Sequence, residues 1–89
     1  MIERELTVSN RLGLHARATA KLVQLLSPFQ SSVTLSAKGR EINAKSIMGV
    51  MLLAAGQGTV VTLRVDGSDE LAAADAISGL FERRFDEDS

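Results

Sequence analysis

The sequence contains no cysteine, tryptophan or tyrosine, and it has only one proline and one histidine. Without cysteine the chain has neither a disulfide framework nor a thiolate metal site, so packing must stabilise it, as in proteins of the reducing cytoplasm. No apolar run reaches the roughly 20 residues that span a bilayer. Charges at positions 3, 4 and 5 also exclude the apolar segment of a secretory signal. The sequence therefore predicts a cytoplasmic protein without membrane insertion.

An excess of charge of either sign is also missing. Ten basic and eleven acidic residues give a net charge of −1, and three phenylalanines are the only aromatic residues. Nucleic-acid binding requires a basic surface and often stacking rings, so we expect no nucleic-acid partner. A single histidine without cysteine cannot supply the usual tetrahedral ligand set. We therefore expect neither a metal nor a cofactor.

The length of 89 residues and the apolar share of 45% are those of one globular domain, residues 1–89. Apolar and polar residues alternate from position 2 to position 8 with only Arg4 off the pattern, which predicts a strand with one buried face. Apolar spacing then becomes helical, with Thr19, Leu22, Val23 and Leu26 on one stripe, which predicts a helix from about residue 16. The Ser27-Pro28 step should end it, because the residue before proline is pushed out of the α region.

A β-hairpin and a short helix are predicted in the middle of the chain. Alternating residues at 33, 35 and 37, a turn at Lys38-Gly39 and the inward Ile42 indicate the two strands of the hairpin. Ser46 then precedes the apolar run IMGVMLLAA, and glycines follow at 56 and 58. The serine should cap a helix over residues 47–55, which should end at these glycines.

The last third predicts a strand and a helix. Residues 59–65 are rich in β-branched side chains and indicate a strand, which should turn at Asp66-Gly67. Ser68 is predicted to cap the final helix, with two acidic residues at the positive end of its dipole. Its buried side should consist of Leu71, Ala74, Ile77, Phe81 and Phe85, and residues 86–89 should form a solvated acidic tail. The order β-α-β-β-α-β-α predicts an α+β open-faced sandwich, with helices over one face of the sheet.

The only histidine, His15, lies at the predicted start of the first helix. Such a start has backbone N–H groups without internal partners and about half a positive charge, and it binds phosphate. If a ring nitrogen of His15 took a phosphoryl group, the new anion would lie beside these N–H groups and Arg17. Gly13 would let the loop approach closely and tolerate a positive φ. The alternative is an ordinary surface histidine near a helix cap.

The string G-L-H-A-R at residues 13–17 resembles the active-site signature of HPr, the histidine-containing phosphocarrier family of the bacterial phosphoenolpyruvate-dependent phosphotransferase system. AKSIMGVMLLAAGQGT, residues 44–59, is similar to the family's second signature, and the resemblance extends from residue 1 to about 85. It looks most like proteobacterial HPr and the nitrogen-related carrier NPr. The resemblance implies a four-stranded antiparallel sheet covered on one face by three helices. It also implies phosphorylation of His15, stabilisation of the phosphoryl group by Arg17, and regulatory phosphorylation of Ser46 by an HPr kinase/phosphorylase.

One departure from the family pattern is Ala18, where proline is common. Proline suits the first helical turn because its missing N–H has no partner there anyway. Alanine keeps the helix and adds a donor, so we expect the carrier function to survive.

The helix after Ser46 is apolar nearly all round, so its side chains cannot all face one sheet. Methionine and leucine on the outer side favour a partner surface, because methionine adapts to several shapes. The alternative is a fully buried short helix. The resemblance implies docking to enzyme I and the IIA proteins by a monomer, and a phosphate on Ser46 would oppose such docking to acidic partners. The residues expected at this surface are Ala16, Lys21, Lys45, Ile47, Met48, Met51 and Leu52.

Three functions follow from these observations. The first is a stoichiometric phosphoryl carrier, not an enzyme, in which His15 takes phosphate from phosphorylated enzyme I and passes it to IIA proteins. The second is a nitrogen or carbon regulatory module on the same fold that acts mainly by docking to partners and through Ser46, with His15 idle. The third is a generic ligand-binding or RNA-binding domain, which the near-neutral charge and lack of stacking aromatics disfavour. The sequence favours the carrier, and its residues do not distinguish sugar uptake from nitrogen regulation.

Overall fold

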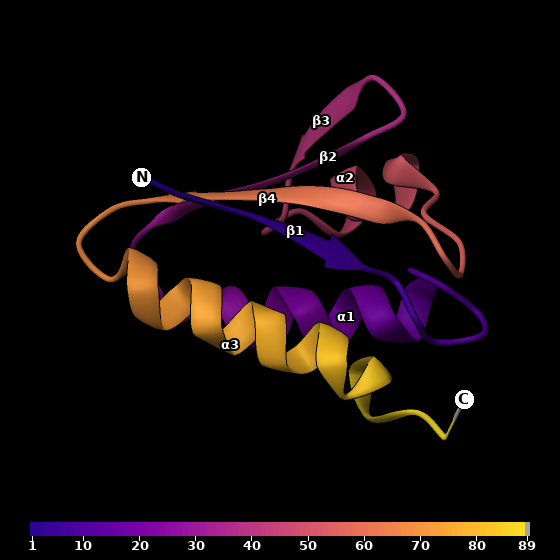
Figure 1. The fold of residues 1–89 in the computed structure, drawn as a ribbon. Coiled ribbons are helices and arrows are strands. Elements are labelled where there is room, and N and C mark those ends of the chain that lie inside the picture. The colour runs from indigo at the N-terminus through magenta and orange to yellow at the C-terminus, as the bar shows by residue number, and fades with distance from the viewer. Residues whose placement is uncertain (89) are drawn as a thin grey trace.

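The structure is a computed structural model that describes residues 1–88, so Ser89 of the predicted tail lies outside the described residues. Four antiparallel strands form one sheet in the order β1-β4-β2-β3, and helices cover one of its faces (Figure 1). This confirms the predicted element order and layering. The elements are β1 (Ile2–Thr7), α1 (Ala16–Leu26), β2 (Ser32–Ala37), β3 (Arg40–Asn43), α2 (Ile47–Leu53), β4 (Val60–Asp66), α3 (Glu70–Glu82) and a short 3-10 turn, η1 (Arg84–Asp86).

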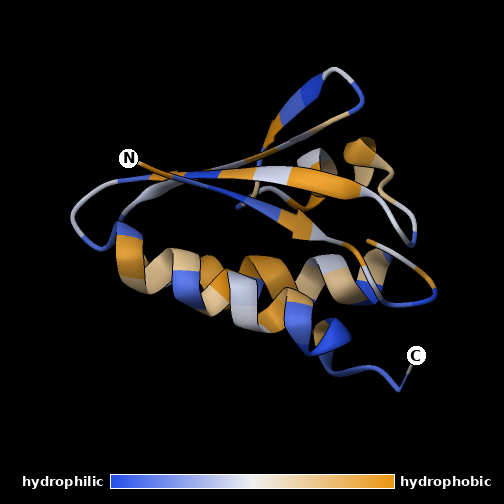
Figure 2. Cartoon of the chain, in the orientation of Figure 1, coloured by the Kyte–Doolittle hydropathy of each residue, from blue (hydrophilic) through white to orange (hydrophobic). Residues whose placement is uncertain are grey.

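The core lies between the sheet and the helices. Because side chains alternate along a strand, Leu63 and Val65 of β4 point to the helices and are completely buried. They pair across the sheet with Leu35 and Val33 of β2, which are also buried. Arg64 lies on the opposite, open face, where it pairs with acidic side chains of β1 and β3. Figure 2 shows the resulting hydrophobic colouring along β4 and on the helices beneath it.

Helix α1 begins and ends where the sequence predicts, with Ser27 as the C-terminal cap before Pro28. Its buried face includes Thr19 and Leu22, whereas Val23, expected on that face, is half-buried. Ala18 is completely buried in the first turn, so the helix forms there without the proline that is common in related sequences.

The hairpin is confirmed, and the short helix ends earlier than expected. Ala37 pairs with Arg40 across a two-residue turn whose residues, Lys38 and Gly39, have φ values of 54° and 78°. Both values are positive, as a type I′ hairpin turn requires. Helix α2 ends at Leu53, because the next residue, Ala54, adopts the left-handed conformation and its N–H bonds to the carbonyl of Met51. The predicted end at the following glycines is therefore wrong.

Two expectations for α3 are wrong for tertiary reasons. Asp69, not Ser68, is the N-terminal cap, and its carboxylate accepts hydrogen bonds from Gln30 and Ser31 instead of capping its own helix. Leu71, expected to be buried, is 59% exposed. At 3.6 residues per turn it lies about 120° around the axis from the buried Ile77, outside the stripe that faces the sheet.

Of the acidic residues predicted to form a solvated tail, Asp86 and Asp88 are exposed, whereas Glu87 is half-buried. Arg84, Phe85 and Asp86 all have positive φ values of 55°, 56° and 61°, so the chain reverses through a left-handed turn. This conformation costs about 1–2 kcal/mol per residue for L-amino acids, so other contacts must offset it. Phe85 is completely buried as predicted, with its ring centroid 4.9 Å from that of Phe81, but it lies in η1 and not on α3, which ends at Glu82. The turn brings the end of the chain back towards the loop before α1 (Figure 1).

Candidate functional site

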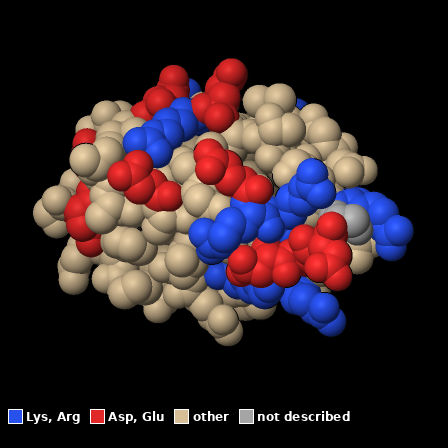
Figure 3. All heavy atoms as spheres, turned by 60° about the horizontal axis from the view of Figure 1, so that its bottom comes forward, with Lys and Arg blue, Asp and Glu red and all other residues tan. Residues whose placement is uncertain are grey.

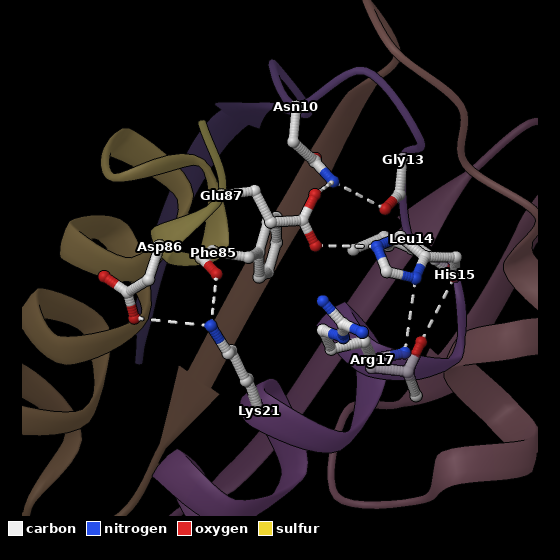
Figure 4. Close-up of polar contacts among 10 residues, drawn as sticks. Asn10, Gly13, Leu14, His15, Arg17, Lys21, Phe85, Asp86 and Glu87 are labelled. Atoms are coloured by element: carbon white, nitrogen blue, oxygen red, sulfur yellow. Dashed lines mark hydrogen bonds and ion pairs between the residues drawn. The ribbon is translucent and has the colours of Figure 1, made fainter. Parts of the chain in front are cut away.

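His15 is the N-terminal cap of α1, in extended backbone geometry with φ −75° and ψ −178°. Its carbonyl accepts the first helical hydrogen bond, from the N–H of Thr19 at 2.9 Å. Its ring nitrogen Nδ1 accepts a hydrogen bond from the backbone N–H of Arg17 at 3.3 Å (Figure 4). The side chain remains 27% exposed. The structure therefore places an accessible imidazole at the mouth of the helix, with the Nδ1 lone pair facing a backbone donor.

The loop before His15 is held tightly against the segment that follows α2. The N–H of Leu14 donates to the carbonyl of Ala55 at 2.9 Å. Gly13 has φ +67°, and a Cβ atom at this position would lie 2.6 Å from the same carbonyl oxygen. The completely buried Asn10 donates from Nδ2 to the carbonyl of Gly13 at 2.8 Å. Both properties expected of Gly13, close approach and positive φ, are confirmed.

The second ring nitrogen of His15 contacts the carboxylate of Glu87, 2.7 Å from Nε2 to Oε2 (Figure 4). Because Nδ1 accepts from Arg17, the single proton of the neutral ring lies on Nε2 and is donated to Glu87. The other carboxylate oxygen accepts a hydrogen bond from Asn10 Nδ2 at 3.0 Å. Glu87 thus joins the histidine and the loop that carries it.

The Glu87 carboxylate is charged although its side chain is only 15% exposed. Burial by itself raises the pKa of this carboxyl group, but the hydrogen bonds from Asn10 and His15 and the charge of Lys21 outweigh it. The net effect holds the pKa of Glu87 below its ordinary value of 4.5. The group is therefore an anion at neutral pH.

Lys21 and Lys45, both expected at the partner surface, make backbone contacts. Lys21 Nζ donates to the carbonyl of Phe85 at 2.8 Å and lies 3.9 Å from the carboxylate of Asp86, so it holds the C-terminal turn against α1. Lys45 Nζ donates to the carbonyl of Phe29 at 2.6 Å. On the face formed by α1 and α3, basic side chains gather with acidic ones among them (Figure 3).

An open pocket of about 460 Å³ lies beside the imidazole. It is large enough for a tetrahedral phosphoryl group and opens to solvent. Two arginine residues line it, and one of them is the exposed Arg17. The lining residues are Arg11, Leu12, His15, Ala16, Arg17, Glu87 and Asp88.

Ser46 caps α2, as predicted. Its Oγ accepts a hydrogen bond from the N–H of Gly49 at 3.1 Å, and the residue itself is partly exposed. The hydroxyl group therefore lies at the start of a helix, next to the apolar residues of α2 that reach the surface.

The outer side of α2 is an exposed apolar surface, so the alternative of a fully buried helix is wrong. Only Val50 and Leu53 of this helix are buried. α2 packs against α1, and part of its ribbon has hydrophobic colouring (Figure 2). A basic residue that the sequence did not indicate, Arg40, donates to the carbonyl of Leu52 at 2.9 Å. The exposed fractions are 49% for Ile47, 75% for Met48, 47% for Met51 and 60% for Leu52.

Asn10 and Glu87 are the site residues that sequence reasoning missed. Asn10 lies in a polar turn segment, and Glu87 lies in a run of acidic residues. Turn residues and acidic ends are ordinarily solvated, so neither carries a local signal. Their roles come from contacts between positions 77 and 72 residues apart in the chain.

Two features of the described residues bear on other functions. Within residues 1–88, His, Asp and Glu side chains form no group of three or more that could hold a metal ion. None of the helices in this range has the length and hydrophobicity needed to cross a membrane.

Comparisons with known proteins agree with this fold. A family described as "PTS HPr component phosphorylation site" matches residues 2–83. The chain is 71% identical over 89 residues to a phosphocarrier protein HPr of Xylella fastidiosa, with all of both chains covered. It is 42% identical to a phosphocarrier protein NPr of Shewanella violacea, covering 99% of this chain and 97% of that one. The crystal structure of HPr-C-His from Thermoanaerobacter tengcongensis superposes with a TM-score of 0.96 and 42% identity, covering 100% of each chain.

Fold, site and relatives together define a phosphocarrier protein of the phosphotransferase system. The chain belongs to the HPr family, and its relatives include proteobacterial HPr and NPr proteins. The resemblance seen in the two sequence motifs is confirmed.

Proposed function

We propose that residues 1–89 act as one cytoplasmic, monomeric domain in which His15 carries the phosphoryl group. His15 accepts it from phosphorylated enzyme I and passes it to IIA proteins, as a stoichiometric carrier and not as an enzyme. The observation that carries this proposal is the contact of 3.3 Å between the Arg17 N–H and Nδ1 of His15. Because Nδ1 is the acceptor in this contact, it carries no proton, and its lone pair lies at the positive end of a helix.

The transfer needs no additional reactant. The Nδ1 lone pair forms a bond to phosphorus while the bond between phosphorus and the donor breaks, and that electron pair stays with the donor. The first N–H groups of a helix have no acceptor within the helix, so those of Ala16 and Ala18 are available to the phosphoryl oxygens. The N–H of Arg17, which donates to Nδ1 in the unphosphorylated protein, becomes available when Nδ1 bonds to phosphorus. The Arg17 guanidinium borders the same pocket and adds a charge-assisted donor.

The exposed side of α2 supports a partner surface beside the phosphoryl site. Ile47, Met48, Met51 and Leu52 are large apolar side chains at the surface of a helix that packs on α1. An interface built on one short helix is small, which suits a carrier that must leave each partner quickly. Ala16, exposed in the first turn of α1, would join the phosphoryl site to this surface.

Ser46 is proposed as a regulatory phosphorylation site for an HPr kinase/phosphorylase. Phosphorylation would place nearly two negative charges at the start of α2, which the helix dipole tolerates. The same charges would border the apolar docking surface and oppose an acidic partner. Phosphorylation would then weaken docking without unfolding the domain.

The function is tested by incubating the protein with enzyme I, Mg²⁺ and phosphoenolpyruvate. We expect one added phosphate with the acid lability and base stability of phosphohistidine. His15→Ala should lose this phosphate, and Ser46→Ala should keep it. A stable phosphate in the His15→Ala variant would refute the assignment of His15.

A further inference from the structure

We propose that Glu87 is a positioning residue for the phosphoryl transfer at His15. Its carboxylate keeps the ring proton on Nε2, so that the Nδ1 lone pair faces the helix N-terminus, and it balances the positive charge that the ring gains on phosphorylation. The inference rests on the proposed role of His15 as the carrier residue.

The contact between the two side chains is short and largely shielded from solvent. Nε2 of His15 lies 2.7 Å from Oε2 of Glu87, and the two side chains are 27% and 15% exposed. Ion pairs between fully exposed side chains contribute little, because water and salt screen them. A hydrogen bond to a charged acceptor that is mostly buried is stronger and more directional.

The side chain of Asn10 holds the Glu87 carboxylate in this position. Asn10 uses one amide nitrogen to bond both the carbonyl of Gly13 and the carboxylate of Glu87, at 2.8 and 3.0 Å. The C-terminal chain is thereby tied to the same loop that positions the histidine. The side chain of Asn10 is completely buried, so this link is a fixed part of the site.

The turn just before Glu87 carries backbone strain. Its three residues, Arg84–Asp86, are all in the left-handed region, which is unfavourable for residues other than glycine. Burial of Phe85 and the hydrogen bond from Lys21 to its carbonyl hold this turn in place. Backbone strain of this kind persists only where surrounding contacts impose it, and it concentrates at functional sites. A solvated acidic tail would need neither the strain nor the contacts.

The proton balance of the reaction gives Glu87 its role. A neutral imidazole has one N–H, and only the nitrogen without the proton can attack phosphorus. Arg17 N–H donates to Nδ1 and Glu87 accepts from Nε2, so both contacts select the tautomer with the proton on Nε2. When the bond from Nδ1 to phosphorus forms, the Nε2 proton stays and the ring becomes positive beside the carboxylate. When His15 delivers the phosphoryl group, the bond from Nδ1 to phosphorus breaks and the ring returns to the same neutral tautomer.

The experiment compares Glu87→Ala and Glu87→Gln with a matched control, Glu82→Gln. Glu82 is an exposed acidic residue at the end of α3, and its substitution removes the same charge. Nitrogen-15 NMR of the His15 ring, recorded where the ring is neutral, reports the tautomer. The initial rate of phosphorylation by enzyme I and phosphoenolpyruvate reports the transfer.

We expect the wild type and Glu82→Gln to show the Nε2–H tautomer and equal transfer rates. Glu87→Ala should show a larger share of the Nδ1–H tautomer. The kcat/KM of enzyme I for this variant as phosphoryl acceptor should be about tenfold lower, which is the scale of one lost charge-assisted hydrogen bond. Glu87→Gln should keep the Nε2–H tautomer, because its amide oxygen still accepts, and should transfer at an intermediate rate because the charge is gone.

An unchanged tautomer in Glu87→Ala would overturn the proposal, as would transfer at the wild-type rate. A fall in melting temperature without either change would show that Glu87 only fastens the end of the chain. Failure of the wild type to be phosphorylated would instead refute the carrier role of His15, while the tautomer measurement would still report whether Glu87 sets the ring proton.

Discussion

Replacing Gly13 by alanine should destabilise the protein and slow phosphoryl transfer, because the added methyl group meets the backbone that supports His15. An ideal Cβ at this position lies 2.6 Å from the carbonyl oxygen of Ala55 and 2.8 Å from Cα of Gly56. Backbone atoms cannot rotate away as a flexible side chain can. The loop must therefore move, and the hydrogen bond of 2.9 Å from Leu14 N–H to the Ala55 carbonyl must weaken.

The size of the effect follows from two terms. A left-handed φ of +67° costs alanine about 1–2 kcal/mol. Loss of the hydrogen bond to Ala55 costs about 1 kcal/mol more. The sum of about 2–3 kcal/mol should lower the melting temperature by about 10–20 °C for a domain of this size. Gly39→Ala is the matched control, because Gly39 has φ +78° and nothing lies within 4 Å of its added Cβ.

Thermal unfolding followed by circular dichroism and the phosphorylation rate with enzyme I measure the two effects. Gly39→Ala should show only the smaller, conformational loss of stability and should be phosphorylated at the wild-type rate, because the hairpin turn lies outside the site. Gly13→Ala should show the larger loss and slower phosphorylation. Equal losses of stability in the two variants would refute the argument from the close contact with Ala55. An unchanged rate in Gly13→Ala would refute the role of this loop in positioning His15.

Three other predictions use exposed or titrating residues. Ser46→Asp should keep the melting temperature, because aspartate also caps a helix, and it should raise KM for transfer from enzyme I. A large fall in melting temperature would show that Ser46 has only a structural role. Met48→Glu should raise the same KM, whereas Leu71→Glu, on the exposed side of α3, should not; equal effects would contradict the α2 docking surface. Because the pKa of Glu87 lies below the ordinary 4.5, its contacts stabilise the fold above that pH and are lost as the pH falls through the lower folded-state value. Urea unfolding should therefore show Glu87→Gln to be less stable than the wild type at neutral pH and equal to it in acid, and an equal difference at both pH values would refute this.

Local patterns in the sequence were sufficient for most of the fold. The helical spacing before Pro28 predicted both ends of α1, because a helix with one apolar stripe and a proline stop has few alternatives. Alternation around Lys38-Gly39 predicted the hairpin, since the turn itself sets the pairing of Ala37 with Arg40. The position of His15 at the mouth of α1 followed from the same spacing.

Predictions failed where a distant segment competed with a local one. Ser68 is a suitable cap by residue type, yet the helix begins one residue later, and the carboxylate of Asp69 bonds to the backbone of residues 30 and 31. The orientation of α3 on the sheet then leaves Leu71 in solvent, although its spacing from Ala74 looks regular. Helix phase is set by packing when several apolar stripes are available.

By itself, the sequence determined the order of elements, the buried faces of the strands and the place of the single histidine. These features depend on the spacing of neighbouring residues, which periodicity, turn and cap chemistry express directly. Only the tertiary structure decided that Glu87 reaches His15 and that Asn10 joins the two. The physical reason is that acidic residues are ordinarily solvated. Glu87 is half-buried here because the strained turn before it, the buried ring of Phe85 and hydrogen bonds from Asn10 and His15 together make its contact favourable.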